Sequence, residues 1–384
     1  MRNLHYAIMS LCLLSVVFAS CHEDNEHNKK KEEVAEVVSP ILVDTIKAEE
    51  PREYHISLLF AGDLMQHTAQ INAALQPDGS YDYNECFERM HDEIERANVA
   101  IANFETTLSG HPYKGYPCFR APDAFLQAVK DAGFDILLTA NNHCLDGGKA
   151  GLERTIRIMD SLQVSHLGTY VTSEERDSTY PFLLERNGFR IVLLNFTYGT
   201  NGIRVKEPNI VNGIDTTQIS QDLKKALQLS PDVIIALPHW GLEHMTSPST
   251  KQKQLAKWLF DHGVDHIIGG HPHAPQPIEL SPDKHHLIAW SLGNYIDHMI
   301  RYSANTGYMI RMEFTKRNDS TQLTDWRCLP YWVSHPSDNN YSHNFRVMPL
   351  NEPDSLLTKD EIWKRNATQK LLKEVMEKKV IFIQ

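Results

Sequence analysis

Five short apolar runs that each end in a possible metal ligand constrain this 384-residue chain more than any other feature. The runs are HISLLFAGD, VAIANFE, DILLTANNH, DVIIALPHW and HIIGGHPH, at residues 55–63, 99–105, 135–143, 232–240 and 266–273. Continuous apolar sequence is typical of strands that are buried on both faces. Helical patterns stand between the runs, at residues 86–97, 123–133, 150–162 and 251–263. The alternation predicts βαβ units and an α/β fold.

Every run closes on side chains that can bind a metal ion. The side chains at these ends are Asp63, Glu105, Asn142, His239, His271 and His273. The carboxyl ends of strands in an open α/β sheet border the crevice in which ligands bind, so we expect these side chains to converge. A single polar residue at a strand end is most often a helix cap or a turn residue. Capping does not explain five such ends, and the pattern therefore predicts a metal site.

The donor atoms indicate which ions would bind there. Carboxylate and imidazole groups without thiolate suit manganese, iron or zinc, whereas oxygen ligands alone would suit magnesium or calcium. Glu105 can bridge two ions and Asn142 can add a neutral carbonyl oxygen, so we expect one or two divalent ions. Gly269 and Gly270 would let the backbone approach the ions closely, and Pro272 would stiffen the loop between the two histidines.

The first residues of the chain predict export. Residues 1–20, MRNLHYAIMSLCLLSVVFAS, have a basic head, an apolar stretch that is short for a bilayer span, and small residues at the end. Cys21 follows at once, and VFASC resembles a bacterial lipobox, in which the signal is cut before a cysteine that is then acylated. A plain secretory signal with an incidental cysteine is the alternative. The charged sequence after Cys21 predicts a polar tether over residues 21–53, so we expect a lipoprotein exported to the outer membrane or cell surface.

Charge and cysteine content exclude several other classes of protein. Loss of residues 1–20 removes Arg2 and no acidic residue, which moves the formal net charge from −11 to −12. Such an acidic chain argues against nucleic acid as a partner, but not against an anionic substrate held by metal. The cysteines beyond Cys21 are Cys86, Cys118, Cys144 and Cys328. They are widely spaced and form no CxxC, which indicates neither a disulfide framework nor a cysteine zinc site.

Several motifs together resemble one family. GDLM, NFET, TANNHCLDGG, PHWGLEH, GGHPHAPQPIE and WSLGNY follow one another in the order and spacing of the CapA-type family of capsule and poly-γ-glutamate synthesis. The resemblance covers residues 56–314. It implies the fold of the calcineurin-like metallophosphoesterases, a four-layer α/β sandwich with its metal site at the carboxyl ends of the strands. We expect this domain at residues 54–330, followed by an extension at 331–384 whose amphipathic helix docks on the domain.

The resemblance also implies roles for individual residues. Asp63 matches the aspartate that opens the metal site, and Glu105 stands where phosphoesterases have a bridging carboxylate. Asn142 and His143 match an Asn-His pair in which the asparagine is a ligand and the histidine faces the substrate. The later histidine ligands of the family match His239, His271 and His273.

Other positions depart from the family or have open roles. Phosphoesterases usually have Asp-x-His at the first motif, but here Met65 stands in place of the histidine, and the nearby His67 is a candidate substitute or a solvent-facing residue. Asp146 is expected to orient His143 or to cap the next helix, and Cys144 to be a packed small side chain rather than a reactive thiol. Arg120 would bind an anionic substrate or form a structural salt bridge.

The residues and the resemblance lead to two hypotheses of function. The first is an enzyme of the cell envelope that uses metal to cleave or transfer a phosphoester or a γ-glutamyl amide bond in an anionic polymer or its precursor, with His143 as the general acid. The second is a non-catalytic component that binds the polymer for export. Fold alone does not separate them.

Overall fold

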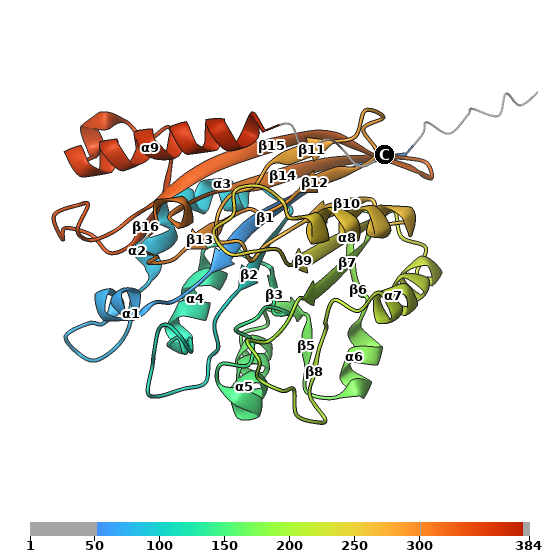
Figure 1. Cartoon of the computed structure of the whole chain (residues 1–384), viewed down its shortest axis with the longest axis horizontal. Helices are drawn as coiled ribbons and strands as arrows, with labels where there is room; N and C mark the ends of the chain where they lie inside the picture. Colours follow the sequence, from blue (N-terminus) through green and yellow to red (C-terminus); the bar gives the residue numbers. More distant parts are fainter. Residues whose placement is uncertain (1–51, 300, 379–384) are drawn as a thin grey trace, which may run out of the picture. The chain divides into compact units, whose positions relative to one another are not determined.

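The expected apolar runs form neighbouring parallel strands in two sheets of the computed structural model (Figure 1). The structure describes residues 52–299 and 301–378. The expected signal peptide at residues 1–20, the lipidation site Cys21 and the tether as far as residue 51 therefore lie outside the described residues. Of the expected tether, only residues 52 and 53 are described, and Glu53 already belongs to the first strand.

The first sheet has eight strands in the order β16-β15-β14-β1-β2-β3-β4, and β13 pairs with the end of β1. Its strands are β1 (Glu53–Leu64), β2 (Val99–Phe104), β3 (Ile136–Leu138), β4 (Ser165–Leu167), β13 (Asn294–Ile296), β14 (Thr306–Arg317), β15 (Ser320–Ser334) and β16 (Arg346–Pro349). Strands β13, β1, β2, β3 and β4 are parallel, and β14, β15 and β16 extend the sheet with antiparallel pairs.

The second sheet has six strands in the order β11-β12-β10-β9-β7-β6. They are β6 (Phe182–Arg186), β7 (Phe189–Thr197), β9 (Val233–His239), β10 (His266–Ile268), β11 (Ile278–Leu280) and β12 (Leu287–Ala289). Strands β7, β9, β10 and β12 are parallel, while the two edge strands are antiparallel. A separate short pair joins β5 (Thr169–Tyr170) to β8 (Ile210–Val211).

Helices cover the outer faces of both sheets. The helices of the described residues are α1 (Thr68–Ala74), α2 (Asn84–Phe87), η1 (Glu88–Met90), α3 (His91–Glu95), α4 (Asp123–Asp131), α5 (Gly148–Ser161), α6 (Ser173–Thr179), α7 (Thr216–Gln228), α8 (Thr250–Asp261), η2 (Tyr302–Ala304), η3 (Asp354–Leu356) and α9 (Lys359–Met376). The expected helix at residues 86–97 is broken into α2, η1 and α3, whereas those at 123–133, 150–162 and 251–263 correspond to α4, α5 and α8.

The alternation of side chains along β1 shows how the layers pack. Leu58 and Phe60 belong to the core between the two sheets, and Leu59 and Ala61 belong to the core under α2, α3 and α4. Successive side chains of a strand point to opposite faces, so one strand contributes to both cores. Helices α7 and α8 pack on the second sheet in the same way. The layers are therefore helix, sheet, sheet and helix, which confirms the expected four-layer α/β sandwich.

The C-terminal part of the described chain is continuous with the domain. The boundary expected at residue 330 falls inside β15, and β16 and α9 follow it. Helix α9 lies along β15 (Figure 1), with Leu372 and Val375 buried. A capping box begins this helix, since Thr358 accepts from the backbone of Glu361 and the Glu361 side chain accepts from the backbone of Thr358. Within 52–299 and 301–378, no helix combines the length and the apolar character that a bilayer crossing requires.

Candidate metal centre

The expected ligands come together where the parallel strands of both sheets end. Asp63 lies in β1, Glu105 directly after β2, Asn142 after β3 and His239 at the end of β9. His271 and His273 follow β10 in the loop 269–277. Each of the six side chains belongs to a residue that is 2 % exposed or less. The carboxyl ends of the parallel strands of both sheets therefore lie close together. They bring together residues that are far apart in the sequence, such as Asp63 and His273, which are 210 positions apart.

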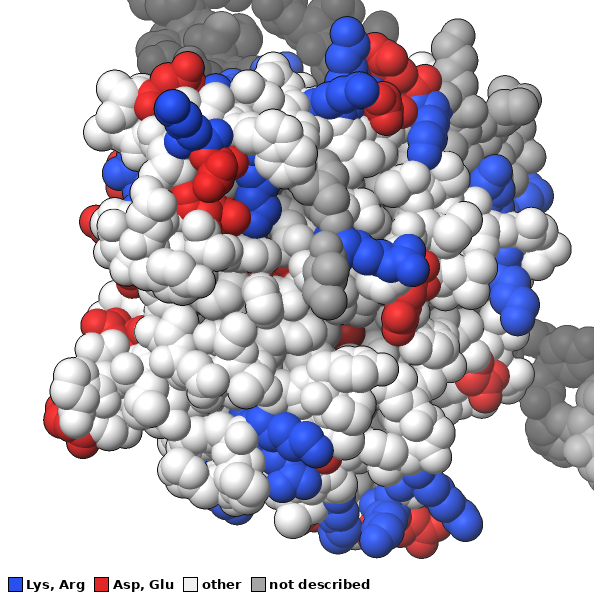
Figure 2. Space-filling model, turned by 60° about the vertical axis from the view of Figure 1, so that its left-hand side comes forward, with Lys and Arg blue, Asp and Glu red and all other residues white. Residues whose placement is uncertain are grey.

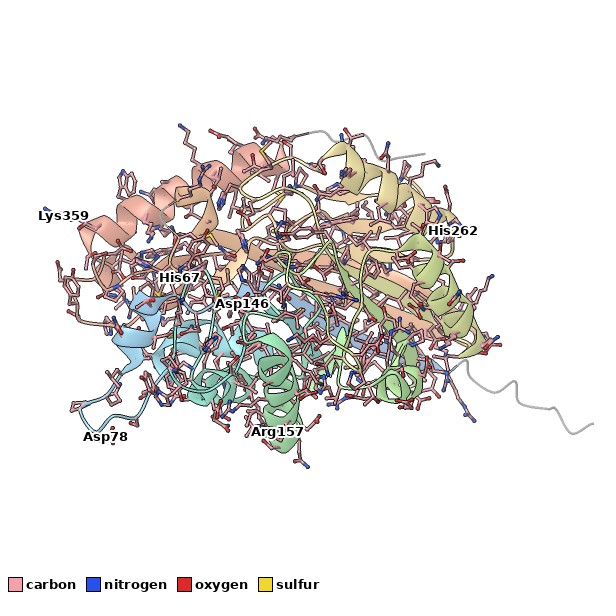
Figure 3. The ribbon with its side chains drawn as sticks, turned by 60° about the horizontal axis from the view of Figure 1, so that its bottom comes forward. His67, Asp78, Asp146, Arg157, His262 and Lys359 are labelled. Atoms are coloured by element: carbon pink, nitrogen blue, oxygen red, sulfur yellow. The ribbon has the colours of Figure 1, made fainter. Side chains whose placement is uncertain are left out.

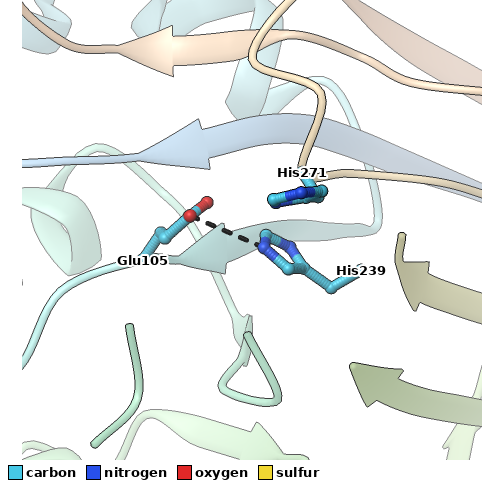
Figure 4. A group of neighbouring side chains, drawn as sticks. All are labelled: Glu105, His239 and His271. Carbon is cyan, nitrogen blue, oxygen red and sulfur yellow. Dashed lines mark ion pairs between the residues drawn. The ribbon is translucent and has the colours of Figure 1, made fainter. Parts of the chain in front are cut away.

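Two groups of ligand atoms share the carboxylate of Glu105. The first ligand group is Asp63, Glu105 and His273, and the second ligand group is Glu105, His239 and His271. Within each group the ligand atoms lie within 4.8 Å of one another. Figure 4 shows the second group, in which the Glu105 carboxylate faces the two imidazole rings.

Distances place one atom of Glu105 between the two groups. Its Oε1 lies 3.5 Å from His239 Nε2 in the second group and 3.7 Å from His273 Nε2 in the first. Asn142 Oδ1 lies 2.6 Å from His239 Nε2, so Asn142 adjoins the second group. One carboxylate oxygen in contact with both groups is the arrangement that a bridging ligand needs.

Unsatisfied polar atoms test whether a cation fits. Glu105 Oε1 and His271 Nδ1 are buried and have no hydrogen-bond partner. Buried polar atoms without partners are costly, and in native proteins they call for an ion, a water or a functional explanation. A divalent cation at either group would satisfy such atoms, and carboxylate, imidazole and amide oxygen donors suit manganese, iron or zinc. The residues present therefore fit the expected metal.

The charges of these residues are strongly coupled. Burial would raise the pKa of Asp63, but the hydrogen bond and the charge of His273 and the charge of His239 hold it below its ordinary value. Burial lowers the pKa of His273, yet the carboxylates of Glu105 and Asp63 raise it to about 10. Burial, together with the charges of His239 and His273, holds the pKa of His271 well below its ordinary value. His273 would have to release its proton to ligate an ion, because only neutral imidazole is a ligand.

The loop after β10 explains the glycine pair and the two unusual histidines. A Cβ on Gly270 would lie 3.0 Å from Asp63 Oδ1, so only glycine lets this backbone pass the carboxylate freely. A Cβ on Gly269 would instead lie 2.3 Å from the carbonyl oxygen of Trp290, so this glycine serves packing rather than approach to the ions. His271 and His273 have positive φ angles of 93° and 54°, a backbone conformation that residues other than glycine rarely adopt. Backbone strain of this kind is typical of functional loops.

His143 and Asp146 form a buried pair beside the ligands. His143 Nδ1 donates to Asp146 Oδ2 over 2.7 Å, and the same oxygen accepts from the backbone of Phe119 over 2.6 Å. The Phe119 ring packs edge-on against His143 at 4.6 Å. Asp146 does not cap α5, whose N-cap is Gly147 without a side-chain bond. The imidazole of His143 is thus held in one orientation, and it belongs to neither ligand group.

His67 lies near the site without joining a ligand group. Figure 3 shows His67 and Asp146 in the middle of the molecule, whereas the other labelled residues stand at its margin. The centre of the His67 ring lies 5.1 Å from that of Phe119 and 6.4 Å from that of His298. Its Nε2 is buried and has no hydrogen-bond partner. Burial and the charges of His298 and His273 lower its pKa to about 4. His67 is therefore neutral at physiological pH, but it does not fill the place that Met65 leaves.

The other candidates have different surroundings. Arg120 is half-buried with an unpartnered Nε, and no carboxylate in the described part of the chain forms an ion pair with it. Cys144 packs with Leu145, Leu152 and Ile156, and burial raises the pKa of its thiol to about 12. An unreactive packed thiol is what these surroundings produce.

Several polar residues of the site escaped sequence reasoning. Asn103 lies inside the run that ends at Glu105, and Asn141 stands directly before Asn142. Asn201 and the half-exposed Tyr198 follow β7. The sequence of this strand, FRIVLLNFT, is mostly apolar, like that of the five other runs. The Tyr198 ring lies 4.4 Å from that of His271. The sequence signal that could have identified Asn103 is a single amide side chain in an apolar strand, two residues before the expected ligand Glu105.

Comparisons with known proteins agree with the motifs. Residues 57–299 match the model of the family described as bacterial capsule synthesis protein PGA_cap. The chain is 27 % identical over 255 residues to "Capsule biosynthesis protein CapA" of Bacillus anthracis, which covers 63 % of this chain and 59 % of that protein. It is 26 % identical over 306 residues to "PGA biosynthesis protein CapA" of Bacillus subtilis, which covers 73 % of this chain and 75 % of that protein.

Among solved structures, the chain is similar to the calcineurin-like phosphoesterase YfkN from Bacillus subtilis. The TM-score is 0.43 at 14 % identity, over 85 % of this chain and 99 % of that one. The family match extends over more than half of the chain and includes most of β1 and all of β2, β3, β9 and β10, whose ends carry both ligand groups. The chain belongs to the bacterial capsule synthesis protein family PGA_cap, as its motifs led us to expect.

Proposed function

We propose that this protein is a metal-dependent hydrolase or transferase that acts on an anionic cell-envelope polymer or its precursor, in capsule or poly-γ-glutamate synthesis or processing. The observation that carries the proposal is Glu105 Oε1, a buried oxygen that has no hydrogen-bond partner and lies 3.5 Å from His239 Nε2 and 3.7 Å from His273 Nε2. The names of the two Bacillus relatives, for capsule and PGA biosynthesis, support the choice of polymer.

The two ligand groups would hold the ions. The first would use Asp63, Glu105 and His273, and the second would use Glu105, Asn142, His239 and His271. Divalent ions bound there would lower the pKa of a water molecule and stabilise negative charge that develops on the substrate.

In this proposal His143 is the residue that moves a proton. Because Asp146 accepts the proton of Nδ1, the second nitrogen, Nε2, is the atom that can donate a proton to a leaving group. Asn201 Nδ2 lies 3.5 Å from this nitrogen and 3.4 Å from Nδ1, so Asn201 adds a polar contact to the ring. A binding protein has little reason to keep an imidazole oriented in this way next to the ligands.

The polymer itself is proposed on charge and chemistry. On the face shown in Figure 2, Lys and Arg side chains are interspersed with Asp and Glu and form no continuous basic surface. Nucleic acid, which is held mainly through clustered basic side chains, is a poor fit to that face. An anionic group of the substrate would instead be held through the ions, with the unpaired Arg120 as a further cationic contact.

Replacement of His143 separates catalysis from binding. We expect His143→Ala to keep its metal content and its affinity for substrate but to turn over phosphoester or poly-γ-glutamate substrates about 10²–10⁴-fold more slowly. The matched control is His166→Ala, since His166 also pairs with an aspartate, Asp160, at 3.0 Å, but lies in β4 at the edge of the first sheet. Normal turnover in His143→Ala would remove this residue from the mechanism. A metal-replete wild type that binds the polymer but converts none of these substrates would establish the non-catalytic export role instead.

We also propose that lipid on Cys21 anchors the protein to the cell envelope. The proposal rests on the lipobox-like VFASC and the charged sequence that follows it. We expect Cys21→Ser to lose lipid labelling and to leave the membrane fraction, while Cys12→Ser, inside the expected signal, retains both. Unchanged membrane association of Cys21→Ser would contradict the anchor.

A further inference from the structure

Asn103 contacts the two carboxylates of the candidate metal centre without being one of the expected ligands. It lies in β2, two residues before Glu105, and is 6 % exposed. Its Nδ2 donates to Asp63 Oδ1 over 2.7 Å and to Glu105 Oε2 over 3.1 Å. A single amide nitrogen therefore bonds one oxygen of each carboxylate.

A neighbouring amide determines which way Asn103 points. Asn103 Oδ1 accepts from Asn141 Nδ2 over 3.1 Å, and Asn141 Nδ2 also donates to the carbonyl oxygen of Phe104 over 2.9 Å. A flipped Asn103 would turn its carbonyl oxygen toward two carboxylates and its NH₂ group toward another donor. The amide nitrogen has two hydrogens, and its two shortest contacts are those to the carboxylates; a third contact, of 3.3 Å, joins it to His239 Nδ1.

The bonds to Asn103 leave one oxygen of each carboxylate directed at the histidines. Asp63 Oδ2 lies 3.3 Å from His273 Nδ1. Glu105 Oε1, which has no hydrogen-bond partner, faces His239 Nε2 and His273 Nε2. Asn103 thus binds Asp63 Oδ1 and Glu105 Oε2. The other two oxygens, Asp63 Oδ2 and Glu105 Oε1, lie on the side of the histidines, where ions would be held, and Asp63 Oδ2 also accepts from the backbone of His271 over 3.4 Å.

We infer that Asn103 is a positioning residue, which orients the carboxylates of Asp63 and Glu105 so that both ligand groups are preformed. The inference rests on the proposed metal centre and adds to it a residue that sets its geometry. Two carboxylates close together repel one another, and the donor hydrogens of Asn103 offset part of that repulsion before an ion arrives. Partners of metal ligands typically change metal affinity 10–100-fold when they are replaced.

The test compares metal binding by the full-length wild type, Asn103→Ala and Asn103→Leu. Leucine has the branched shape of asparagine but no donor, so it keeps the core filled if the alanine variant fails to fold. We expect both variants to bind Mn²⁺ about 10–100-fold more weakly in a chelator competition. With Co²⁺ as the probe, the visible absorption of the bound ion should change in position or intensity, because the carboxylates no longer present the same atoms.

Asn212 supplies the control. It is also 6 % exposed and uses both ends of its amide, accepting from Arg176 Nε over 2.7 Å and donating to the carbonyl oxygen of Asn195 over 3.1 Å. We expect Asn212→Ala to lose folding stability while its Mn²⁺ affinity and Co²⁺ spectrum stay those of wild type. Equal Mn²⁺ affinities of Asn103→Leu and wild type would overturn the role of Asn103 while the metal centre stands. Absence of metal binding by wild type would overturn the centre itself, and the inference with it.

Discussion

The two ligand groups on either side of Glu105 differ in their donors and in the pKa values of their histidines. The second group has Glu105, His239 and His271, and Asn142 Oδ1 adjoins it at 2.6 Å from His239 Nε2. The first group has Asp63, Glu105 and His273, and Asn294 Oδ1 adjoins it at 2.8 Å from His273 Nδ1. Glu105 and Asp63 hold the pKa of His273 at about 10, so an ion in the first group must displace a proton, whereas the pKa of His271 in the second group lies well below its ordinary value. A shared carboxylate can thus serve two positions of unequal strength, and we expect the second group to bind its ion more tightly.

Removal of the shared ligand should have the largest effect. Glu105→Gln keeps the size of the side chain but removes the charge that both groups use, so both positions should lose their ions. A ligand at 100 times its Kd stabilises the native state by about 2.7 kcal/mol. We therefore expect Mn²⁺ to raise the Tm of wild type but not of Glu105→Gln, as measured by calorimetry with and without the ion. A variant that gains as much stability from Mn²⁺ as wild type would show that Glu105 is not the shared ligand.

The sequence predicts some parts of the fold and of the site and not others. The runs that became β1, β2, β3, β9 and β10 were readable because buried parallel strands are continuously apolar and their ligands follow at once. Helix α5 was readable from the spacing of Leu152, Ile156 and Met159, all of which are buried.

Other features depend on strand register and on the orientation of side chains, which the sequence pattern does not reveal. Asn103 bonds Asp63 because β1 and β2 are neighbours in register, with Asp63 opposite Asn103. That His67 contacts Phe119 and His298 and joins neither group follows from the chain's path into α1. The distribution of donors between the two groups therefore required the structure.

Replacement of one histidine in each group should separate the two positions. We expect His271→Ala to empty the second position and leave the weaker first one, and His273→Ala to leave the tighter second one. Elemental analysis after dialysis against a range of free Mn²⁺ concentrations would then give a higher remaining affinity for His273→Ala. The same remaining affinity in both variants would contradict the difference between the groups.

Addition of a histidine should have the smallest effect, and in the opposite direction. Met65 is fully buried two residues after Asp63, where phosphoesterases usually have histidine. We expect Met65→His to tighten the first position by about tenfold, which corresponds to about 1.4 kcal/mol, and to leave the second unchanged. Mn²⁺ titration monitored by calorimetry would show the two steps move closer together. A weakened second step would mean that residue 65 acts on the site through packing instead.

The most direct test of the shared carboxylate is a crystal structure of the protein with Mn²⁺, with anomalous diffraction used to locate the ions. We predict an ion bonded to Glu105 Oε1 together with His239 and His271 at low Mn²⁺, and a second ion bonded to the same oxygen with Asp63 and His273 at high Mn²⁺. Anomalous density elsewhere in the protein, with Glu105 Oε1 bonded to no ion at any concentration, would contradict the account.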